Sequence, residues 1–297
     1  MKSEYITPVV TAFREDGSLD AAANEAIYEH LIRGRVSGIV IMGSLGEFFG
    51  LTMEQKKALI DIAAAKIAHR TKLIVGVTSM LADEAAALAE YAADRGADGV
   101  LAVSPYYFRL PDAFVEAYYS RLAENTRADI YLYNFPERTG YTISSAVTLR
   151  LAKKYKNIVG YKDTIGGMDH TRELINVVKR ELPAFKIYSG FDENFAHNIL
   201  AGGDGCIGGL SNIMPEVCAA WVEAFADEDM MRVMAIQDTI DQMMDIYGIA
   251  PLFIPCMKTA MKLRGLPIED VCSFPIGGNT AAEKEKVAAL LKKMKLI

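Results

Sequence analysis

Blocks of basic residues are absent from this 297-residue sequence, in which 32 Lys and Arg stand against 38 Asp and Glu for a formal charge of −6. We therefore expect no nucleic acid and no anionic membrane surface among its partners. No apolar run approaches the roughly 18 residues of a membrane span, and the first residues lack the apolar stretch of a signal peptide. The four cysteines show no C-x-x-C spacing, which is typical of buried thiols in a reducing compartment. These absences together predict a cytoplasmic protein.

The chain does contain a regular alternation of short β-branched runs with segments of helical period, and 51% of its residues are hydrophobic. The expected strands are residues 5–11, 38–42, 72–77, 99–103, 130–133, 158–162, 186–189 and 205–209. The expected helices between and after them are residues 20–33, 53–68, 83–95, 111–124, 144–153, 168–180, 193–200 and 215–226. Eight near-equal units without a long insertion favour an α/β fold, a (β/α)8 TIM barrel, over a doubly wound sheet.

The expected barrel covers residues 1–228, and residues 229–297 carry no strand signal. We expect a C-terminal helical extension there, with three helices at 229–247, 251–263 and 280–294 packed on the barrel. Helix-start signals support the assignments: a capping box at Thr52, caps at Asp83 and Ser144, and prolines suited to the first helical position at Pro111 and Pro215.

Lys162 is the most informative single residue. It ends the apolar run 158–161, and the C-terminal ends of barrel strands form the catalytic face. Burial disfavours the charged form of a lysine, and a neutral amine can attack a carbonyl to form a Schiff base. The alternatives are a solvated lysine at a strand end or a lysine paired with Asp163.

Other chemistry-bearing residues also follow expected strands. The Tyr133 hydroxyl could reach the Lys162 nitrogen and shuttle protons if it is hydrogen-bonded to a hydroxyl such as that of Ser44. The alternatives are an ordinary aromatic cap for Tyr133 and a simple turn residue for Ser44. Arg138 could hold a substrate carboxylate with its guanidinium fork, or form a loop ion pair with a neighbouring acid.

Asp192 and Glu193 could bind substrate hydroxyls or a divalent metal, or they could be the acidic start of the next helix. The four histidines lack the spacing of metal ligands, so we expect no metal. The string Gly203-Asp204-Gly205-Cys206-Ile207-Gly208 matches G-x-G-x-x-G but leads into a strand, which argues against a dinucleotide site.

Four motifs in combination resemble those of the dihydrodipicolinate synthase/N-acetylneuraminate lyase family of class I aldolases, and the resemblance extends over the whole chain. The motifs are Gly43-Ser44-x-Gly46-Glu47, Pro105-Tyr106-Tyr107, Tyr133-Asn134-x-Pro136 and Gly160-x-Lys162-Asp163-Thr164. The resemblance implies that Lys162 forms an imine with pyruvate or another 2-keto acid, with no metal or other cofactor.

The same resemblance implies roles for further residues. Tyr133 would transfer protons, relayed by Ser44 and by Tyr107, which in this family reaches into the site of a neighbouring subunit of a homotetramer. The backbone N–H groups of Ser44 and Leu45 would hold the pyruvate carboxylate. The implied substrate-binding residues are Leu45, Arg138, Thr164, Gly190, Asp192, Glu193, Ile207 and Gly209.

The sequence shares features with more than one branch of this family. Arg138 resembles the synthase branch, whereas Thr164 and the 190–193 segment resemble the lyase branch. Leu45 replaces the threonine usual in both named enzymes, and Gly209 stands where the lyase normally has a serine. Glu47-Phe48 and the 133–136 segment look more like the aldolases of 2-keto-3-deoxy sugar acids and of 4-hydroxy-2-oxoglutarate.

We expect a lyase that cleaves a 2-keto-3-deoxy sugar acid, of the sialic acid or 2-keto-3-deoxygluconate type, to pyruvate and an aldehyde. The alternatives are a synthase that condenses pyruvate with aspartate semialdehyde, a 4-hydroxy-2-oxoglutarate aldolase and a dehydratase. A metal-dependent aldolase and a sugar-acid sensor without turnover are further alternatives.

Overall fold

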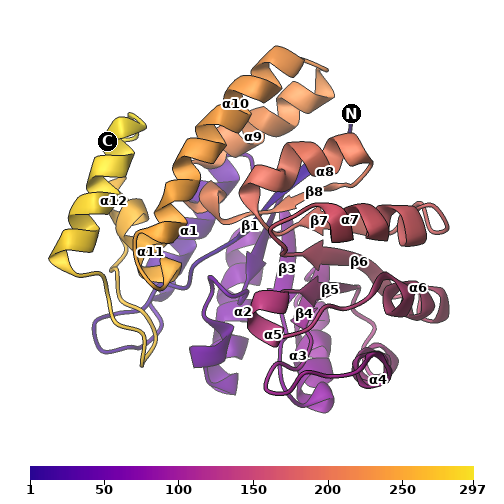
Figure 1. Cartoon of the computed structure of the whole chain (residues 1–297). Helices are drawn as coiled ribbons and strands as arrows, with labels where there is room; N and C mark the ends of the chain where they lie inside the picture. The colour runs from indigo at the N-terminus through magenta and orange to yellow at the C-terminus, as the bar shows by residue number, and fades with distance from the viewer. The chain divides into compact units, whose positions relative to one another are not determined.

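The computed structural model describes residues 1–297, in which eight parallel strands are ordered β1 to β8 in a closed barrel with helices between them (Figure 1). The strands are β1 (Glu4–Pro8), β2 (Gly38–Ile41), β3 (Lys72–Gly76), β4 (Gly99–Val103), β5 (Ile130–Asn134), β6 (Ile158–Asp163), β7 (Lys186–Ser189) and β8 (Gly205–Ile207). Almost every strand residue is buried, which explains why these segments are apolar runs rather than alternating ones. The predicted α/β barrel is therefore confirmed.

Residues 1–71 and 209–297 form one compact unit, and residues 72–208 form the other. The first contains β1, β2 and the helices α1 (Ala21–Arg33), η1 (Phe48–Gly50), α2 (Met53–Ile67), η4 (Gly209–Asn212), α9 (Pro215–Ala226), α10 (Met230–Met243), η5 (Met244–Gly248), α11 (Phe253–Leu263) and α12 (Ala281–Lys293). Within it α9 packs against α10, and α11 against α12 (Figure 1).

The second unit contains β3 to β8 and their connecting helices. These are α3 (Ala82–Asp94), α4 (Asp112–Glu124), α5 (Pro136–Thr139), α6 (Ser145–Lys154), α7 (Asp169–Leu174), η2 (Ile175–Lys179, a π-helical turn), η3 (Asp192–Asn194) and α8 (Phe195–Ala201). The β5–β6 and β6–β7 pairs align the last residues of three neighbouring strands, Asn134, Asp163 and Ser189. Because of this register, the side chains at the ends of the three strands lie at the same level along the barrel axis.

Most local signals in the sequence are confirmed. Thr52 and Gln55 form the complete capping box of α2, the Ser144 side chain caps α6, and Pro215 is the first residue of α9. Two expectations were wrong. Asp83 does not cap α3, because the helix begins one residue earlier at Ala82, and its carboxylate pairs with Arg121 instead. Pro111 precedes α4 as its cap residue and is not its first helical residue.

Two strands end at least two residues earlier than expected. β1 stops at Pro8 and not at residue 11, since the Val10 N–H turns to the side-chain oxygen of Asn212, 3.2 Å away. β8 stops at Ile207, and Gly209 already begins the 3-10 helix η4. All four cysteines are buried and free, as their spacing predicts.

Candidate active site

Lys162 lies where the sequence predicts, at the end of β6. It pairs in register with Tyr133 of β5 and Tyr188 of β7, and only 4% of its surface is exposed. Its Nζ lies over the face of the Tyr133 ring, 4.3 Å from the centroid. The contact between these two residues therefore runs through the ring face, and Lys162 is not the solvated strand-end lysine of the first alternative.

Asp163 does not form an ion pair with Lys162, and its carboxylate contacts other side chains instead. Its Oδ1 accepts a hydrogen bond from Asn134 Nδ2 at 2.8 Å, and its Oδ2 accepts one from Thr171 Oγ1 at 2.7 Å. His170 Nδ1 lies 3.0 Å from the same Oδ2. Burial by itself would lower the pKa of His170, but the hydrogen bond and the charge of Asp163 raise it above the usual value. The second alternative for Lys162 is therefore not observed.

A chain of aromatic rings connects the Tyr133 ring to Arg138. Tyr133 stacks on Phe135, with 6.0 Å between ring centroids and 21° between planes. Phe135 meets Phe191 edge-on at 6.5 Å, and the Arg138 guanidinium carbon lies 5.4 Å from the Phe135 centroid. Arg138 is exposed on the short helix α5. Its planar cation is thus held against the same aromatic cluster that contacts Lys162.

Thr164 and Gly190 lie together just beyond the ends of β6 and β7. The Gly190 N–H donates to the Asp163 carbonyl at 2.7 Å. A Cβ at Gly190 would lie 1.9 Å from Thr164 Oγ1, so only glycine fits beside this threonine. Thr164 is buried, and its hydroxyl has no hydrogen-bond partner in the protein. Because buried hydroxyls are normally paired, this one is suited to a bound substrate.

Asp192 and Ile207 are both buried. Burial raises the pKa of the neighbouring Cys206 thiol well above its usual value, and the charges of Asp192 and Glu193 raise it further. The thiol is therefore protonated at neutral pH. Asp192 and Glu193 also open the 3-10 helix η3, so the helix-start alternative describes their position, and it does not conflict with substrate binding.

In the other unit, Ser44 and Leu45 lie in a tight turn after β2. The Glu47 N–H donates to the Ser44 carbonyl at 3.2 Å. A Cβ at Gly46 would lie 2.8 Å from the Met42 backbone nitrogen, so the turn needs glycine there. Leu45 is buried and Ser44 is half-buried. The turn expected from the Gly-Ser-x-Gly pattern is thus present.

A buried ion pair that the sequence pattern did not predict holds this turn. Lys258 of α11 and Glu47 are both fully buried, and Lys258 Nζ lies 2.5 Å from Glu47 Oε1. Lys258 also donates to the Val271 carbonyl at 2.6 Å, and Glu47 Oε2 accepts the Ser273 N–H at 2.6 Å. A signal existed, because Lys258 interrupts the apolar segment Ile254–Met261, in which every residue is buried.

Tyr107 stands apart from these contacts. It follows β4, is 79% exposed and meets Phe108 edge-on at 4.8 Å. Phe108 and Phe114 are strongly exposed as well. Within the chain, Tyr107 therefore presents its ring to solvent.

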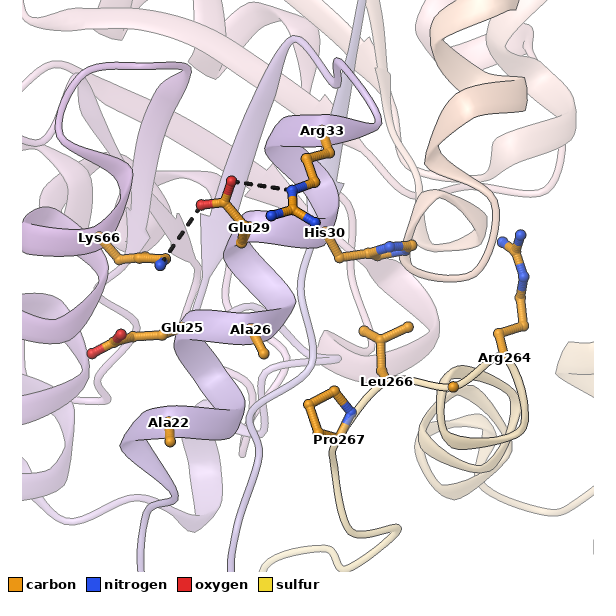
Figure 2. Close-up of a pocket in the computed structure, with 11 residues that line it drawn as sticks. Ala22, Glu25, Ala26, Glu29, His30, Arg33, Lys66, Arg264, Leu266 and Pro267 are labelled. Carbon is orange, nitrogen blue, oxygen red and sulfur yellow. Dashed lines mark ion pairs between the residues drawn. The ribbon is translucent and has the colours of Figure 1, made fainter.

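A groove of about 670 Å³ on the first unit is not the candidate site. It is lined by α1 and by residues 264–267, and it contains none of the predicted site residues (Figure 2). Glu29 lies there between Arg33 and Lys66, at 3.4 and 3.7 Å. Burial lowers the pKa of His30, and the charge of nearby Arg264 lowers it further. The acidic and basic groups of this groove largely neutralise one another.

Neither a metal cluster nor a membrane-spanning helix is found in the structure. No group of three or more His, Cys, Asp and Glu side chains is arranged to hold a metal ion. None of the helices combines the length and the hydropathy that a transmembrane segment requires.

Known proteins share the sequence pattern and the architecture of this chain. Residues 1–294 match the model of the dihydrodipicolinate synthetase family. A protein of Escherichia coli K12 named a probable 2-dehydro-3-deoxy-D-pentonate aldolase, YjhH, is 35% identical, over 97% of this chain and 96% of its own length. YagE of the same organism carries the provisional name 2-dehydro-3-deoxy-D-gluconate aldolase and is 32% identical over 98% of this chain and 96% of its own.

The crystal structure of YagE in complex with pyruvate superposes with a TM-score of 0.96 and covers 99% of both chains. Fold and site thus define an α/β-barrel enzyme of the aldolase type. The chain belongs to the dihydrodipicolinate synthetase family.

Proposed function

We propose that this protein is a class I lyase that cleaves a 2-keto-3-deoxy sugar acid to pyruvate and an aldehyde through an imine on Lys162. The observation that carries the proposal is the Lys162 environment: a buried amine at a strand end, against the Tyr133 ring, with Asp163 held by other partners. The names of YjhH and YagE favour the 2-keto-3-deoxy acid class of substrate.

In the proposed reaction, Lys162 Nζ attacks the C2 ketone and water leaves, which gives a protonated imine. Tyr133 removes the proton of the C4 hydroxyl, and the C3–C4 bond breaks. Its electron pair moves into the imine, which becomes an enamine, and an aldehyde departs. Protonation at C3 and hydrolysis then release pyruvate and restore the amine.

The other residues have supporting roles in this proposal. Ser44 and Tyr107 relay protons to Tyr133, and the N–H groups of Ser44 and Leu45 bind the substrate carboxylate. Thr164, whose hydroxyl has no protein partner, binds the sugar chain together with Gly190, Asp192, Glu193 and Ile207. No metal or other cofactor takes part, so prolonged dialysis against a chelator should leave turnover unchanged. A loss that Zn²⁺ or Mg²⁺ restores would favour the metal-dependent alternative.

We also propose a homotetramer located in the cytoplasm. The exposed Tyr107, Phe108 and Phe114 supply apolar surface that an interface would cover. Light scattering at assay concentration tests the assembly. A fully active monomer would contradict it and would leave Tyr107 without a role in catalysis.

The decisive experiment is borohydride reduction in the presence of pyruvate, followed by peptide mass spectrometry. The expected result is irreversible inactivation and one adduct, on Lys162. The other buried lysine, Lys258, serves as an internal control and should remain unmodified. No adduct, or an adduct on another residue, would overturn the imine mechanism.

Arg138 supports one alternative, the condensation of pyruvate with aspartate semialdehyde. Its guanidinium is held on the aromatic cluster around Tyr133 and could grip the carboxylate of a second substrate. A substrate panel separates the possibilities. It measures pyruvate release from N-acetylneuraminate, 2-keto-3-deoxygluconate and 4-hydroxy-2-oxoglutarate, alongside condensation with aspartate semialdehyde. If the highest kcat/KM is measured for the condensation of pyruvate with aspartate semialdehyde, the proposed activity would be that of the synthase and not of the lyase.

A further inference from the structure

A side-chain hydrogen bond connects the ends of β5 and β6 on the face away from Lys162. Successive residues of a strand point to opposite faces. Tyr133 and Lys162 are paired in register and meet on one face, with Nζ over the ring. Asn134 and Asp163, the next residue of each strand, are paired as well, and Asn134 Nδ2 donates to Asp163 Oδ1 at 2.8 Å. The two contacts therefore lie on opposite faces of the same pair of strands.

The pairing of β5 with β6 is not regular along its whole length. Its register shifts between Ile130 and Tyr131, where β6 advances by one residue more than β5, as in a β-bulge. A slip of one residue moves every side chain of a strand to the other face. The register at the start of the strands therefore does not dictate that Tyr133 stands beside Lys162, and the pairing at the strand ends needs a support of its own.

Both partners of this hydrogen bond are held by further contacts. Asn134 Oδ1 accepts the Ile143 N–H at 3.0 Å. Asp163 Oδ2 accepts the Thr171 hydroxyl at 2.7 Å, and His170 Nδ1 lies 3.0 Å from it. With an N–H on one side and a carboxylate on the other, the Asn134 amide has one favourable orientation. Asn134 and Asp163 are each only 1% exposed, so the hydrogen bond is fixed in direction and protected from water.

We propose that Asn134 and Asp163 are positioning residues, whose hydrogen bond fixes the register in which Tyr133 stands beside Lys162. The inference rests on the proposed function, in which Lys162 forms the imine and Tyr133 transfers the proton. It extends that function by giving a role to the residue that follows each of these groups in the chain. A displacement of about 1 Å between reacting groups can lower a rate by about 10²-fold, so this hydrogen bond affects the reaction through the place of Tyr133.

The first variant is Asn134→Asp, which removes the donor and sets a second carboxylate against Asp163. We expect kcat for pyruvate release to fall by about tenfold, and by no more than the roughly 10²-fold expected when the Tyr133 hydroxyl is absent. KM should change by less than about twofold, because substrate binding is not affected. Trapping of pyruvate by borohydride, which reports on Lys162, should persist. Wild-type kcat in Asn134→Asp would overturn the inference.

The second variant exchanges the two side chains, as Asn134→Asp/Asp163→Asn. The amide at 163 then donates to the carboxylate at 134, whose other oxygen still accepts the Ile143 N–H. The amide oxygen at 163 remains an acceptor for Thr171 and His170. Because the hydrogen bond is restored with donor and acceptor reversed, kcat should return to within about threefold of wild-type, a non-additivity expected for residues in contact. A kcat as low as that of Asn134→Asp would contradict the proposal.

A third variant separates positioning from a general loss of structure. If the hydrogen bond acts by placing the Tyr133 hydroxyl, adding Asn134→Asp to Tyr133→Phe should lower kcat by less than about a further twofold, because both changes act through the same group. A structural role would lower kcat whether or not that hydroxyl is present. A further tenfold loss in the Tyr133→Phe background would therefore reject the positioning role.

Asn157→Asp is the matched control, with the same substitution at the other end of β6. The Asn157 amide donates to the Ala123 and Thr126 carbonyls at 3.1 and 3.0 Å, so this variant also removes hydrogen bonds next to the strand. It should keep the wild-type kcat. A tenfold loss here would show that any disturbance of β6 lowers kcat, and it would overturn the inference as well.

The outcomes separate this inference from the proposed function. If wild-type enzyme forms no borohydride adduct with pyruvate, or if Tyr133→Phe keeps the wild-type kcat, the proposed reaction fails at its imine or at its proton transfer. If the adduct forms and Tyr133→Phe lowers kcat, but Asn134→Asp does not, only the positioning role of Asn134 and Asp163 fails.

Discussion

Two lysines are buried in this protein, one in each unit, and they are held in opposite ways. Lys258 is completely buried and pairs with the Glu47 carboxylate, with its Nζ also 4.7 Å from the Phe13 ring centroid. Lys162 is buried almost as fully, but no carboxylate forms an ion pair with it, and its Nζ faces the Tyr133 ring. The neighbouring carboxylate, Asp163, is occupied by Asn134, Thr171 and His170.

The contrast teaches that burial by itself does not define a nucleophile. A buried carboxylate offsets the desolvation of an ammonium, and the ion pair with Glu47 gives Lys258 a structural role. The Lys162 amine instead faces an aromatic ring, and the proposed function makes this amine the nucleophile that attacks the carbonyl. The group that each lysine contacts, rather than its exposure, therefore distinguishes the proposed roles of the two residues.

Removing the amine at Lys162 should give the largest effect. In Lys162→Ala we expect pyruvate release to fall by about 10³-fold or more, because no other group can form the imine. The fold should persist, as circular dichroism would show. Lys153→Ala, at an exposed ion pair with Glu181, is the control and should keep wild-type turnover. Substantial activity in Lys162→Ala would show that the Lys162 amine is not the nucleophile and that the two buried lysines do not differ in this way.

Removing the amine at Lys258 should act on stability instead. Lys258→Met leaves Glu47 buried and unpaired, which should lower the free energy of unfolding by about 3–5 kcal/mol in urea titration. The double variant Glu47→Gln/Lys258→Met contains no buried charge and should recover much of this loss. A single variant as stable as wild-type would show that the ion pair does not hold α11 to the turn after β2.

Tyr133→Phe sharpens the comparison because it keeps the ring against Lys162 and removes only the hydroxyl. We expect kcat to fall by about 10²-fold, within the range typical of positioned proton transfer. Trapping of pyruvate by borohydride, which reports on the amine, should persist in the variant. If the variant keeps the wild-type kcat, Tyr133 does not take part in the proton relay, and its role is limited to the packing of its ring against Lys162.

The smallest expected effect concerns the partner that occupies Asp163. Because the pKa of His170 is raised in the folded protein, its ion pair with Asp163 stabilises the fold fully below about pH 6.5, the usual histidine value. That stabilisation is lost as the pH rises through the folded pKa. The difference in Tm between wild-type and His170→Gln should therefore be larger at pH 6 than at pH 9. A difference that grows toward pH 9 would contradict the assignment.

The sequence predicted the architecture well because the barrel depends on local patterns. Apolar β-branched runs and capped amphipathic segments occur at the right spacing, and every strand was placed within three residues of its bounds. Lys162 was found for the same reason, since its position at a strand end is visible in the sequence. Boundaries were less certain where tertiary contacts decide them, as when Asn212 takes the Val10 N–H and ends β1.

The remaining features depend on contacts between distant segments, which spacing does not encode. Nothing local indicates that Lys258 meets Glu47. A lysine in a helix is ordinarily solvated, so the helical pattern of α11 did not indicate that Lys258 is buried. The alternative that paired Lys162 with Asp163 was excluded only when the structure supplied His170 and Thr171 as partners of that carboxylate.

The Glu47–Lys258 pair also has a consequence for how the chain is made. The two residues are 211 positions apart, so the turn that carries Ser44 leaves the ribosome long before its partner is synthesised. At about 5–20 residues per second, that interval is roughly 10–40 s. During it the Glu47 carboxylate remains hydrated, and the turn lacks the contact that later holds it. We therefore expect a nascent chain stalled before Lys258 to keep this turn open to proteolysis, although both β1 and β2 have been completed.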